Sequence, residues 1–402
     1  PRCWLVWVSV AAEQVDLLSL VRHFQSSTFP HMPNTYYISP TGNNSNDGRT
    51  RTAPFQSLRH AKSVLAPGDT AILLHGDYDI EAEYGDNKKW ELEFLAPAEF
   101  KDQRSPDAIY REANFQSRYF PKLGGKIDLW HSLQQFPSHQ APKNCSQILT
   151  IHDLNFLVEK NSKKADAYLR KLQKNVDRAD VITSISDYTK EQIKAKLDLK
   201  GKEIQTIHNG IKLQEFPNHK AQLVPTEKFF FSIGIFSAKK NFHSLLPVLE
   251  KMKGFQLLIA GDSNTPYGEK LKLEIKAKNL ENRVVLTGKI SDADKYWYYK
   301  NCEAFLFPSL AEGFGMPVIE AMTQGKAVFS SDQCSLPEIG GNASFYWTNF
   351  EPDSMLQILE KGLEEAEKDP KEFQQKQKKH AAQFSWESCI QKYLKLYNQT
   401  LS

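Results

Sequence analysis

From about residue 90 onward, short apolar runs alternate with segments of helical spacing, and this alternation limits the fold more than any other feature of the chain. The apolar runs end in polar residues, and the segments between them carry apolar residues at helical spacing. The runs are KIDLWHS, QILTIHDL, ADVITSIS and IQTIHNG, and the helical segments are ADAYLRKLQKNVDRA and DYTKEQIKAKL. This order predicts a parallel sheet covered by helices on both faces.

A second set of the same kind occupies residues 229–331 and predicts a complete doubly wound domain. The polar stretch near 216–227 separates the two sets, and 402 residues are ample for two domains. In open α/β sheets, ligands bind outside the carboxyl ends of the strands. We therefore expect two domains whose strand-end loops surround one cleft. The strand-end residues are Lys240, Gly261, Gly288, Glu312, His152 and Asn209.

Composition excludes some classes of protein. A net charge of +3 does not indicate a partner such as bulk nucleic acid. The five cysteines are scattered and form no Cys-x-x-Cys pair, which argues against a disulfide framework and favours the cytoplasm. The first apolar run, CWLVWVSVAA, is too short to span a bilayer. No motif indicates a metal, since the chain has no His-x-x-x-His pair.

The N-terminal stretch does not share the alternating pattern. Residues 1–33 are amphipathic and receive no assignment, and Met32 is a candidate start of translation for the rest of the chain. Residues 35–80 predict a strand at 36–39, a helix at 55–65, a Pro-Gly-Asp turn and a strand at 70–74. This order resembles the opening of pectate-lyase-like parallel β-helix proteins. A solenoid needs at least three stacked repeats, and the sequence contains no further ones.

The stretch SLAEGFGMPVIEAM, residues 309–322, predicts an anion site. Pro317 suits the first position of a helix, where its missing N–H costs nothing. Gly313 and Gly315 let the preceding loop bring its backbone close to a ligand. Free amides and the positive end of the helix then favour a phosphate.

Two carboxylates flank this turn. Glu312 lies before the helix and Glu320 about one turn inside it, so the two do not share a helical face. A carboxylate beside a phosphate is best explained by hydroxyl groups attached to that phosphate, as in a sugar. The alternative is that Glu320 complements the helix dipole and Glu312 is a solvated loop residue.

Three further features each have a functional and a structural interpretation. Lys239, Lys240 and Asn241 come after the strand that ends at Gly234, where a lysine can reach a second phosphate or simply open a solvated helix. His152 ends another strand and is either a substrate contact or a loop cap. The lysine-rich region 160–202 is a solvated face or a basic surface that rests on an anionic membrane.

Taken in order, several motifs resemble the retaining GT-B glycosyltransferases of family four, which include many bacterial mannosyl- and glucosyltransferases. The likeness covers about residue 90 to the end. The motifs are TIHDLNF, IHNGI, GIFSAKKN, SLAEGFGMPVIEAM and SLPEIGGNA. The resemblance implies two Rossmann-like domains that face a cleft, with a last helix that crosses back to the first domain.

The resemblance also implies roles for the residues around the turn. Glu312 would contact the hydroxyls of the donor sugar and stabilise its developing positive charge. Gly313, Phe314 and Gly315 would give backbone amides to the diphosphate and sugar. Glu320 would hold the ribose of the nucleotide.

Further roles fall on residues outside the turn. Lys240 matches the family lysine that neutralises the diphosphate leaving group, and His152 matches the histidine near the donor sugar. Lys239, Asn241 and Gly234 complete the expected donor-binding set. No metal or tightly bound cofactor is expected, because positive charge and the helix dipole would stabilise the leaving group.

The chain departs from the family pattern at two places. Ile235 stands where family members usually carry an arginine, so the phosphate clamp would rest on Lys239 and Lys240 alone. The strand and glycine-rich loop that usually open the N-terminal domain are not recognisable, so this domain is expected to be incomplete. Either residues 35–80 fold as strand, helix and strand and complete the sheet, or the chain is a fusion of two unrelated fragments. The predicted parts are 1–33 (unassigned), 34–85 (β-helix-like), 90–220 (acceptor-side domain), 221–378 (nucleotide-sugar-binding domain) and 379–402 (crossover helix).

The expected function is retaining transfer of a hexose from GDP-mannose or a UDP-hexose such as UDP-glucose to a glycan or lipid-linked acceptor. The enzyme is expected in the cytoplasm, with peripheral contact to the inner membrane face as an added expectation. The alternatives are a fusion that binds donor nucleotide without transfer, a β-helix-type carbohydrate-binding protein and a nucleotide-sugar epimerase on the same two-domain architecture.

Overall fold

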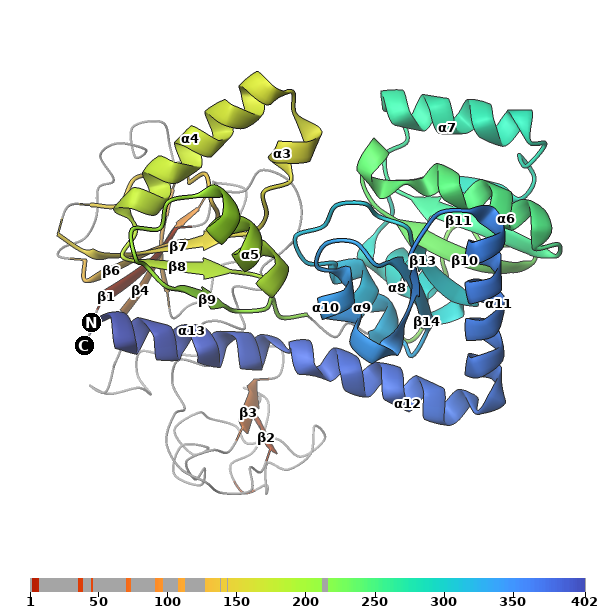
Figure 1. Cartoon of the computed structure of the whole chain (residues 1–402). Helices are drawn as coiled ribbons and strands as arrows, with labels where there is room; N and C mark the ends of the chain where they lie inside the picture. The colour runs from red at the N-terminus through yellow and green to blue at the C-terminus, as the bar shows by residue number, and fades with distance from the viewer. Residues whose placement is uncertain are drawn as a thin grey trace. The chain divides into compact units, whose positions relative to one another are not determined.

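The computed structural model (Figure 1) describes residues 127–401 except 138, 143 and 212–215, together with residue 45 and five short strands nearer the N-terminus. The chain divides into two compact units, residues 1–133, 137–148 and 394–402 in the first, and residues 134–136 and 149–393 in the second. The five strands are β1 (Arg2–Val6), β2 (Thr35–Ile38), β3 (Thr70–Leu73), β4 (Glu91–Ala96) and β5 (Ala108–Glu112).

In the first unit, four strands form a parallel sheet in the order β5-β4-β1-β6, with β6 at Leu129–Ser132. Strand β1 lies in residues 1–33, to which the sequence assigned no element, and it pairs with both β4 and β6. Strands β2 and β3 pair with each other in a separate sheet and confirm the strands predicted near 36–39 and 70–74. The helix predicted at 55–65 and the turn after it lie outside the described residues.

The strands that follow β6 are covered by helices, and two of these helices, α4 and α5, have side-chain caps. Asn161 accepts a hydrogen bond from the Lys164 amide at the start of α4, and Ser186 accepts one from the Thr189 amide at the start of α5. Apolar residues of both helices pack on the strands. The elements are β7 (Ser146–Ile151), α3 (Phe156–Glu159), α4 (Ser162–Arg178), β8 (Val181–Ser184), α5 (Asp187–Lys196) and β9 (Ile204–Thr206).

The rest of the second unit contains a six-stranded parallel sheet in the order β12-β11-β10-β13-β14-β15. This sheet confirms the doubly wound pattern predicted for residues 229–331. Its strands are β10 (Lys228–Ile233), β11 (Phe255–Ala260), β12 (Val284–Gly288), β13 (Ala304–Phe307), β14 (Ala327–Ser331) and β15 (Ser344–Trp347).

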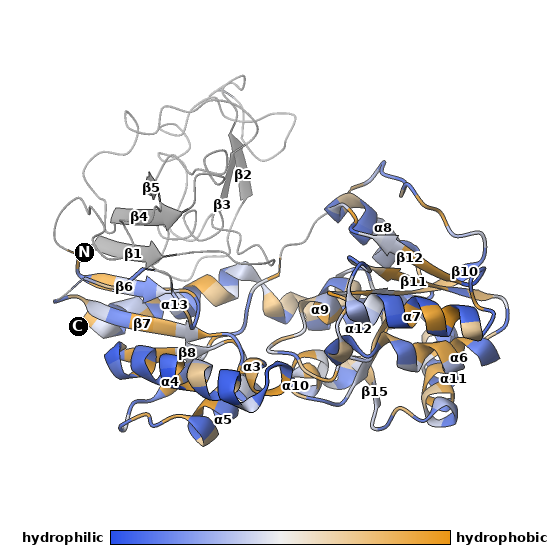
Figure 2. Ribbon diagram, turned by 90° about the horizontal axis from the view of Figure 1, so that it is seen from above, coloured by the Kyte–Doolittle hydropathy of each residue, from blue (hydrophilic) through white to orange (hydrophobic). Residues whose placement is uncertain are grey.

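Helices cover both faces of this sheet because alternate strand residues point to opposite sides. Phe229 and Phe231 pack with α8, α9 and α10, whereas Phe230 packs with α6, α7 and α11. Figure 2 shows mostly hydrophobic residues on β10 and β11, and both kinds of residue on α7. The helices on this sheet are α6 (Leu245–Lys251), α7 (Pro266–Ala277), α8 (Asp292–Asn301), α9 (Met316–Thr323), α10 (Leu336–Gly340), α11 (Pro352–Lys368) and α12 (Pro370–Ala381), and a last helix, α13 (Trp386–Leu401), follows them in the chain.

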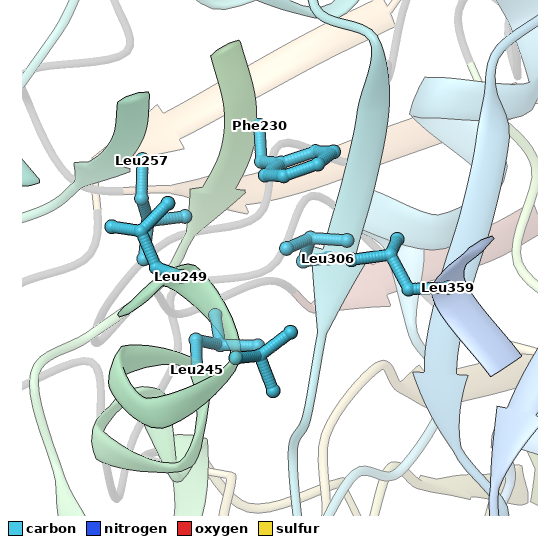
Figure 3. Close-up of a pocket in the computed structure, with 7 residues that line it drawn as sticks. Phe230, Leu245, Leu249, Leu257, Leu306 and Leu359 are labelled. Atoms are coloured by element: carbon cyan, nitrogen blue, oxygen red, sulfur yellow. The ribbon is translucent and has the colours of Figure 1, made fainter. Parts of the chain in front are cut away.

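A small cavity lies on the α6 and α11 side of the sheet (Figure 3). It has a volume of about 10 Å³ and is lined only by apolar side chains, among them Phe230, Leu249, Leu306 and Leu359. A space of this size holds at most about one water molecule, and its lining offers no polar partner. This face of the sheet is therefore part of the hydrophobic core, and the polar groups that could bind a ligand lie at the strand ends.

Residues 210–211, which follow β9, touch residues 384–386 at the start of α13. The Ile211 amide donates to the Phe384 carbonyl over 2.7 Å, and Ile211 forms a bridge with Ser385. A Cβ atom on Gly210 would lie 2.5 Å from the Cα of Trp386, the first residue of α13. Only glycine permits so close an approach of two backbones.

Residues 216–227, where the sequence predicts a boundary, are fastened to α8 by Asp294. Its carboxylate lies 2.8 Å from His219 Nε2 and accepts from Ser291 Oγ over 3.0 Å and from the Gln222 amide over 3.3 Å. Burial by itself would raise the pKa of Asp294, but the hydrogen bonds from His219, Ser291 and Gln222 outweigh burial and hold the pKa below its ordinary value. The ionised side chain therefore stabilises the folded state.

Replacing Asp294 with asparagine is expected to lower the free energy of unfolding at neutral pH. A carboxyl whose pKa is lowered by folding stabilises the protein above its ordinary pKa of 3.8, and the stabilisation disappears as the pH falls below that value. The difference between wild type and Asp294→Asn should therefore shrink in acid, as measured by urea unfolding over a pH series. Asp353→Asn is the control, because the Asp353 side chain is exposed and its loss should change the free energy of unfolding little. A difference that stays constant with pH would contradict this account.

Candidate functional site

The central feature of the site is an ion pair between the ends of two neighbouring strands. Lys240 comes after β10 and Glu312 after β13, and Lys240 Nζ lies 2.6 Å from Glu312 Oε1. Ser309 Oγ donates to the same carboxylate oxygen over 2.6 Å. The two charged side chains are only 10% and 13% exposed. A pair so little exposed costs desolvation energy and adds little to stability, which points to a role in binding or catalysis.

Local backbone geometry places the lysine. Asn241 adopts the left-handed conformation with φ of 54°, which asparagine tolerates better than most residues, and it links two short 3₁₀ turns, η3 (Ala238–Lys240) and η4 (Phe242–Ser244). A Cβ atom on Gly234 would lie 3.0 Å from Lys240 Cε, so glycine leaves room for the lysine stem. Lys240 Nζ also lies 4.8 Å from the centre of the Phe307 ring. These contacts direct the ammonium group towards Glu312.

The neighbouring Lys239 belongs to a second charged group. Its Nζ lies 2.6 Å from Oε1 of Glu159 in α3. Burial would lower the pKa of Lys239, but the hydrogen bond and charge of Glu159, together with the charges of Glu312 and Asp153, raise the pKa above its ordinary value. Burial raises the pKa of Asp153, against the hydrogen bond from the Asn155 amide and the charge of Lys239. Lys239 is therefore a cation held between carboxylates.

The turn Glu312–Gly315, here named the donor turn, is tightly packed from both sides. A Cβ atom on Gly313 would lie 2.4 Å from the carbonyl oxygen of His152 and 2.9 Å from Asp153 Cβ. Gly315 has φ of 114°, and a Cβ atom there would lie 2.8 Å from a methyl group of Leu336. Both glycines are thus required by space or conformation, and the close neighbours recorded here are atoms of the protein itself.

Buried hydroxyl groups hold the carbonyl groups of the donor turn. Ser335 Oγ shares its single proton in a bifurcated hydrogen bond to the carbonyls of Phe314 (2.8 Å) and Glu312 (3.2 Å). Ser186 Oγ donates to the carbonyl of Gly313 over 2.8 Å. In the part of the chain that the structure describes, no acceptor is recorded for the amides of Gly313, Phe314 and Gly315, although all three residues are buried. Helix α9 starts directly after the turn.

The second carboxylate of the motif lies in a separate contact group. Glu320 accepts from Lys295 Nζ over 2.9 Å and from the Tyr299 hydroxyl over 2.9 Å. Burial, together with the charge and hydrogen bond of Glu320, raises the pKa of Tyr299 well above its ordinary value, so the phenol stays protonated and donates. Each oxygen of Glu320 therefore already has a partner on α8, and each keeps further acceptor capacity.

His152 is brought to the donor turn by its backbone. Its carbonyl oxygen faces Gly313 and accepts from Thr189 Oγ1 over 3.2 Å, and its amide donates to Gln135 Oε1 over 3.0 Å. The structure thus brings His152, Lys240, Lys239 and the donor turn into one neighbourhood.

The sequence did not single out several polar residues of this neighbourhood. Ser186, Ser309 and Ser335 donate to it, and Glu159 pairs with it. Serine is common at helix caps and strand ends, so its spacing alone carries little signal. The only available signal was that each serine comes shortly after a predicted strand.

One group of side chains in the described residues has metal-ligand chemistry. Asp187, His208 and Glu338 offer ligand atoms within 4.8 Å of one another. Glu338 already accepts from the amides of Asp187 (2.8 Å) and Tyr188 (3.0 Å), and it lies 2.7 Å from His208 Nε2. The protein therefore supplies the partners of this carboxylate, and the group fastens α10 to the start of α5.

Comparison with known proteins identifies the family. The family model described as Glycosyltransferase Family 4 matches residues 93–215, and the model described as Glycosyl transferases group 1 matches residues 214–384. Among curated relatives, the serotype-specific mannosyltransferase WbdA of Escherichia coli is 26% identical over 264 residues, which is 60% of this chain and 32% of that protein. The O-antigen chain mannosyltransferase RfbU of Salmonella typhimurium is 26% identical over 228 residues, 56% of this chain and 63% of that protein. The chain thus spans from about a third to just under two thirds of the length of these relatives.

Solved structures agree on the fold. Sucrose-phosphate synthase from Thermosynechococcus elongatus superposes with a TM-score of 0.62 at 19% identity, over 77% of this chain and 89% of that one. Anabaena Alr3699/HepE in complex with UDP and glucose superposes with a TM-score of 0.59 at 18% identity, over 77% of this chain and 92% of that one. The chain therefore belongs to the glycosyltransferases of family four and has the GT-B fold.

Proposed function

We propose that the protein is a retaining glycosyltransferase that moves a hexose from a nucleoside-diphosphate sugar to a glycan or lipid-linked acceptor. The observation that carries the proposal is the buried pair of Lys240 and Glu312 beside three buried amides with no recorded acceptor in the described part of the chain. A diphosphate needs the cation and the amides, and a sugar needs a carboxylate that accepts from its hydroxyls. The site offers both kinds of group side by side.

The names of the relatives suggest which donors and acceptors to test first. WbdA and RfbU are mannosyltransferases, and HepE was solved with UDP-glucose, so GDP-mannose and UDP-glucose are the two donors we propose to test first. A Campylobacter jejuni relative, 30% identical over 160 residues, has a diphospho-undecaprenol substrate in its name. That name supports a lipid-linked glycan as the acceptor.

The proposed roles are those that the family resemblance implies, and the contacts of the site are compatible with them. Lys240 exchanges its contact with Glu312 for the diphosphate, and Lys239 does the same with Glu159. Glu312 is then released to accept hydroxyls of the donor sugar and to stabilise positive charge at its reacting carbon. Glu320 uses its remaining acceptor capacity for the ribose, and His152 lies near the sugar. The proposed site, like the cofactor-free enzyme expected from the sequence, draws on lysines and amides for its positive charge.

Retention is proposed to result from attack on the same face of the sugar that the leaving group departs from. The bond between the sugar carbon and the phosphate oxygen breaks, and its electron pair goes to the diphosphate. The acceptor oxygen forms the new bond to that carbon, and its proton passes to the departing phosphate oxygen. Lys240 and the amides of the donor turn stabilise the negative charge that develops on the diphosphate.

Location is part of the same proposal. No helix in the described residues is long and apolar enough to cross a bilayer. Helix α4 exposes Lys163, Lys164, Lys171 and Lys174 while burying Leu172 against the sheet. We place the enzyme at the cytoplasmic face of the membrane, held there by this basic surface and its lipid-linked acceptor.

The test is a nucleotide-release assay with a panel of UDP- and GDP-sugars, with and without lipid-linked acceptor. One donor is expected to release its nucleotide, and Glu312→Ala should lower that rate by about a hundredfold or more. Calorimetric binding of UDP or GDP without turnover would instead favour a protein that binds donor without transfer. A changed sugar released without acceptor would indicate an epimerase. Full activity in Glu312→Ala would overturn the assigned role.

A further inference from the structure

The donor turn is held in one orientation by hydroxyl groups from two other parts of the chain. Ser335, at the start of α10, bonds the carbonyls of Glu312 and Phe314, and Ser186, at the start of α5, bonds the carbonyl of Gly313. Both serine side chains belong to fully buried residues. Three successive carbonyl groups therefore point into the protein.

The direction of the carbonyls fixes the direction of the amides. In a trans peptide, the C=O of one residue and the N–H of the next point in opposite directions, and the described residues contain no cis peptide. Bonding the carbonyls of Glu312, Gly313 and Phe314 to serines therefore turns the amides of Gly313, Phe314 and Gly315 the other way. Neighbouring backbone amides that are turned away from the protein's own acceptors can bind an anion.

Ser186 is itself held on both sides. It is the N-cap of α5 and accepts from the Thr189 amide over 3.1 Å. The next two amides of α5, those of Asp187 and Tyr188, donate to the carboxylate of Glu338 in α10. The start of α5 thus gives a hydroxyl to the donor turn and receives a carboxylate from the helix that carries Ser335. The contact crosses from the residues of one family model to those of the other.

We propose that Ser186 and Ser335 are positioning residues that aim the amides of the donor turn at the diphosphate of the nucleotide. The inference rests on the proposed function. It adds that α5, a helix in the segment that matches the Glycosyltransferase Family 4 model, sets the strength of diphosphate binding. Neither serine touches the substrate. Loss of either hydroxyl lets the peptide units of the turn rotate and removes part of the amide site, while the contacts to base and ribose stay in place.

The experiment measures the affinities of UDP, GDP, UMP and GMP by calorimetry in the wild type, Ser186→Ala and Ser335→Ala. One misaligned hydrogen bond to a charged group corresponds to about a tenfold change in affinity. Each variant should therefore bind the diphosphate about tenfold more weakly, with little change for the monophosphate. The donor KM should rise similarly. Asp369→Ala is the matched control, because it removes the N-cap of α12 without touching the donor turn. It should leave the ratio of diphosphate affinity to monophosphate affinity unchanged.

Thr189→Val gives an independent variant in case the cap lost in Ser186→Ala impairs folding. It keeps the shape and the cap but removes a hydroxyl that lies 2.9 Å from Ser186 Oγ, 3.2 Å from the His152 carbonyl and 3.4 Å from the Gly313 carbonyl. It should lower the preference for diphosphate over monophosphate, to a smaller degree than Ser186→Ala. Equal loss of diphosphate and monophosphate affinity would overturn the positioning role. If the wild type binds neither UDP nor GDP, the proposed function is overturned. If the wild type binds one of them and the variants bind it with the same affinity, this inference alone is overturned.

Discussion

Replacing Lys240 with methionine is expected to lower kcat/KM for the nucleotide sugar by a factor of about a hundred to a thousand. Methionine keeps most of the stem that packs beside Gly234 and Phe307 but removes the ammonium group that is proposed to neutralise the leaving diphosphate. Ile235 offers no charge in compensation, and it is exposed. Steady-state kinetics over donor concentration separate a rise in KM from a fall in kcat. The loss should fall largely on kcat, because charge develops on the diphosphate as the bond breaks.

Stability has to be measured alongside this variant. Without Lys240, the carboxylate of Glu312 keeps only Ser309 as a recorded side-chain partner among the described residues, and a little-exposed carboxylate that has lost its cation lowers the free energy of unfolding. The double variant Lys240→Met with Glu312→Gln removes both charges and should recover part of the stability without recovering activity. Lys272→Ala is the control, because Lys272 forms an exposed pair with Glu269. Near-normal kcat/KM in Lys240→Met would rule out its proposed role.

Replacing Gly313 with alanine is expected to remove donor binding and to destabilise the fold by about 2 kcal/mol. The new methyl group would lie 2.4 Å from the carbonyl oxygen of His152, and neither backbone can yield without moving a strand end. The donor turn would shift, and the hydrogen bond from Ser186 to the Gly313 carbonyl would lengthen or break. Urea unfolding reports the loss of stability, and calorimetry with UDP and GDP reports the loss of donor binding.

Gly254→Ala is the control for Gly313→Ala, because it introduces backbone strain without steric crowding. Gly254 has φ of 79° and nothing within 4 Å of its Cβ position, so alanine there costs only conformational strain, about 1 kcal/mol. It should lose stability but keep donor affinity. If Gly313→Ala bound UDP or GDP as the wild type does, the donor turn would not be the anion site.

Most of the second sheet could be predicted from the sequence because each of its strands is a short apolar run bounded by a turn. The run Phe229–Ile233 is buried on both faces, and such strands show no alternation but precede a clear helix signal. Strand β1 had no such signal. Its residues overlap the apolar run CWLVWVSVAA, which by itself does not distinguish a strand from a helix, and their partners, β4 and β6, lie far along the chain.

The sequence predicted which residues form the candidate site, but not which of them contact one another. Lys240 and Glu312 were each expected to meet a ligand, and the structure shows them paired with each other across 72 residues of sequence. Their adjacency results from the neighbouring positions of β10 and β13, which strand order alone determines. Ser186 and Gly313 are 127 residues apart, and no local pattern marks a hydroxyl that meets a distant carbonyl. Contacts of this kind appear only when the topology is known.

The close approach of Gly210 to Trp386 also bears on how the protein tolerates changes at its C-terminal end. The start of α13 covers Gly210, and the residues just before it supply the Phe384 carbonyl and the Ser385 bridge to Ile211. A protein shortened before this point would leave the amide of Ile211 without its acceptor, in the segment that joins the two sheets. The segment that follows β9 is thus held by a backbone bridge from residues that lie about 175 positions further along the chain.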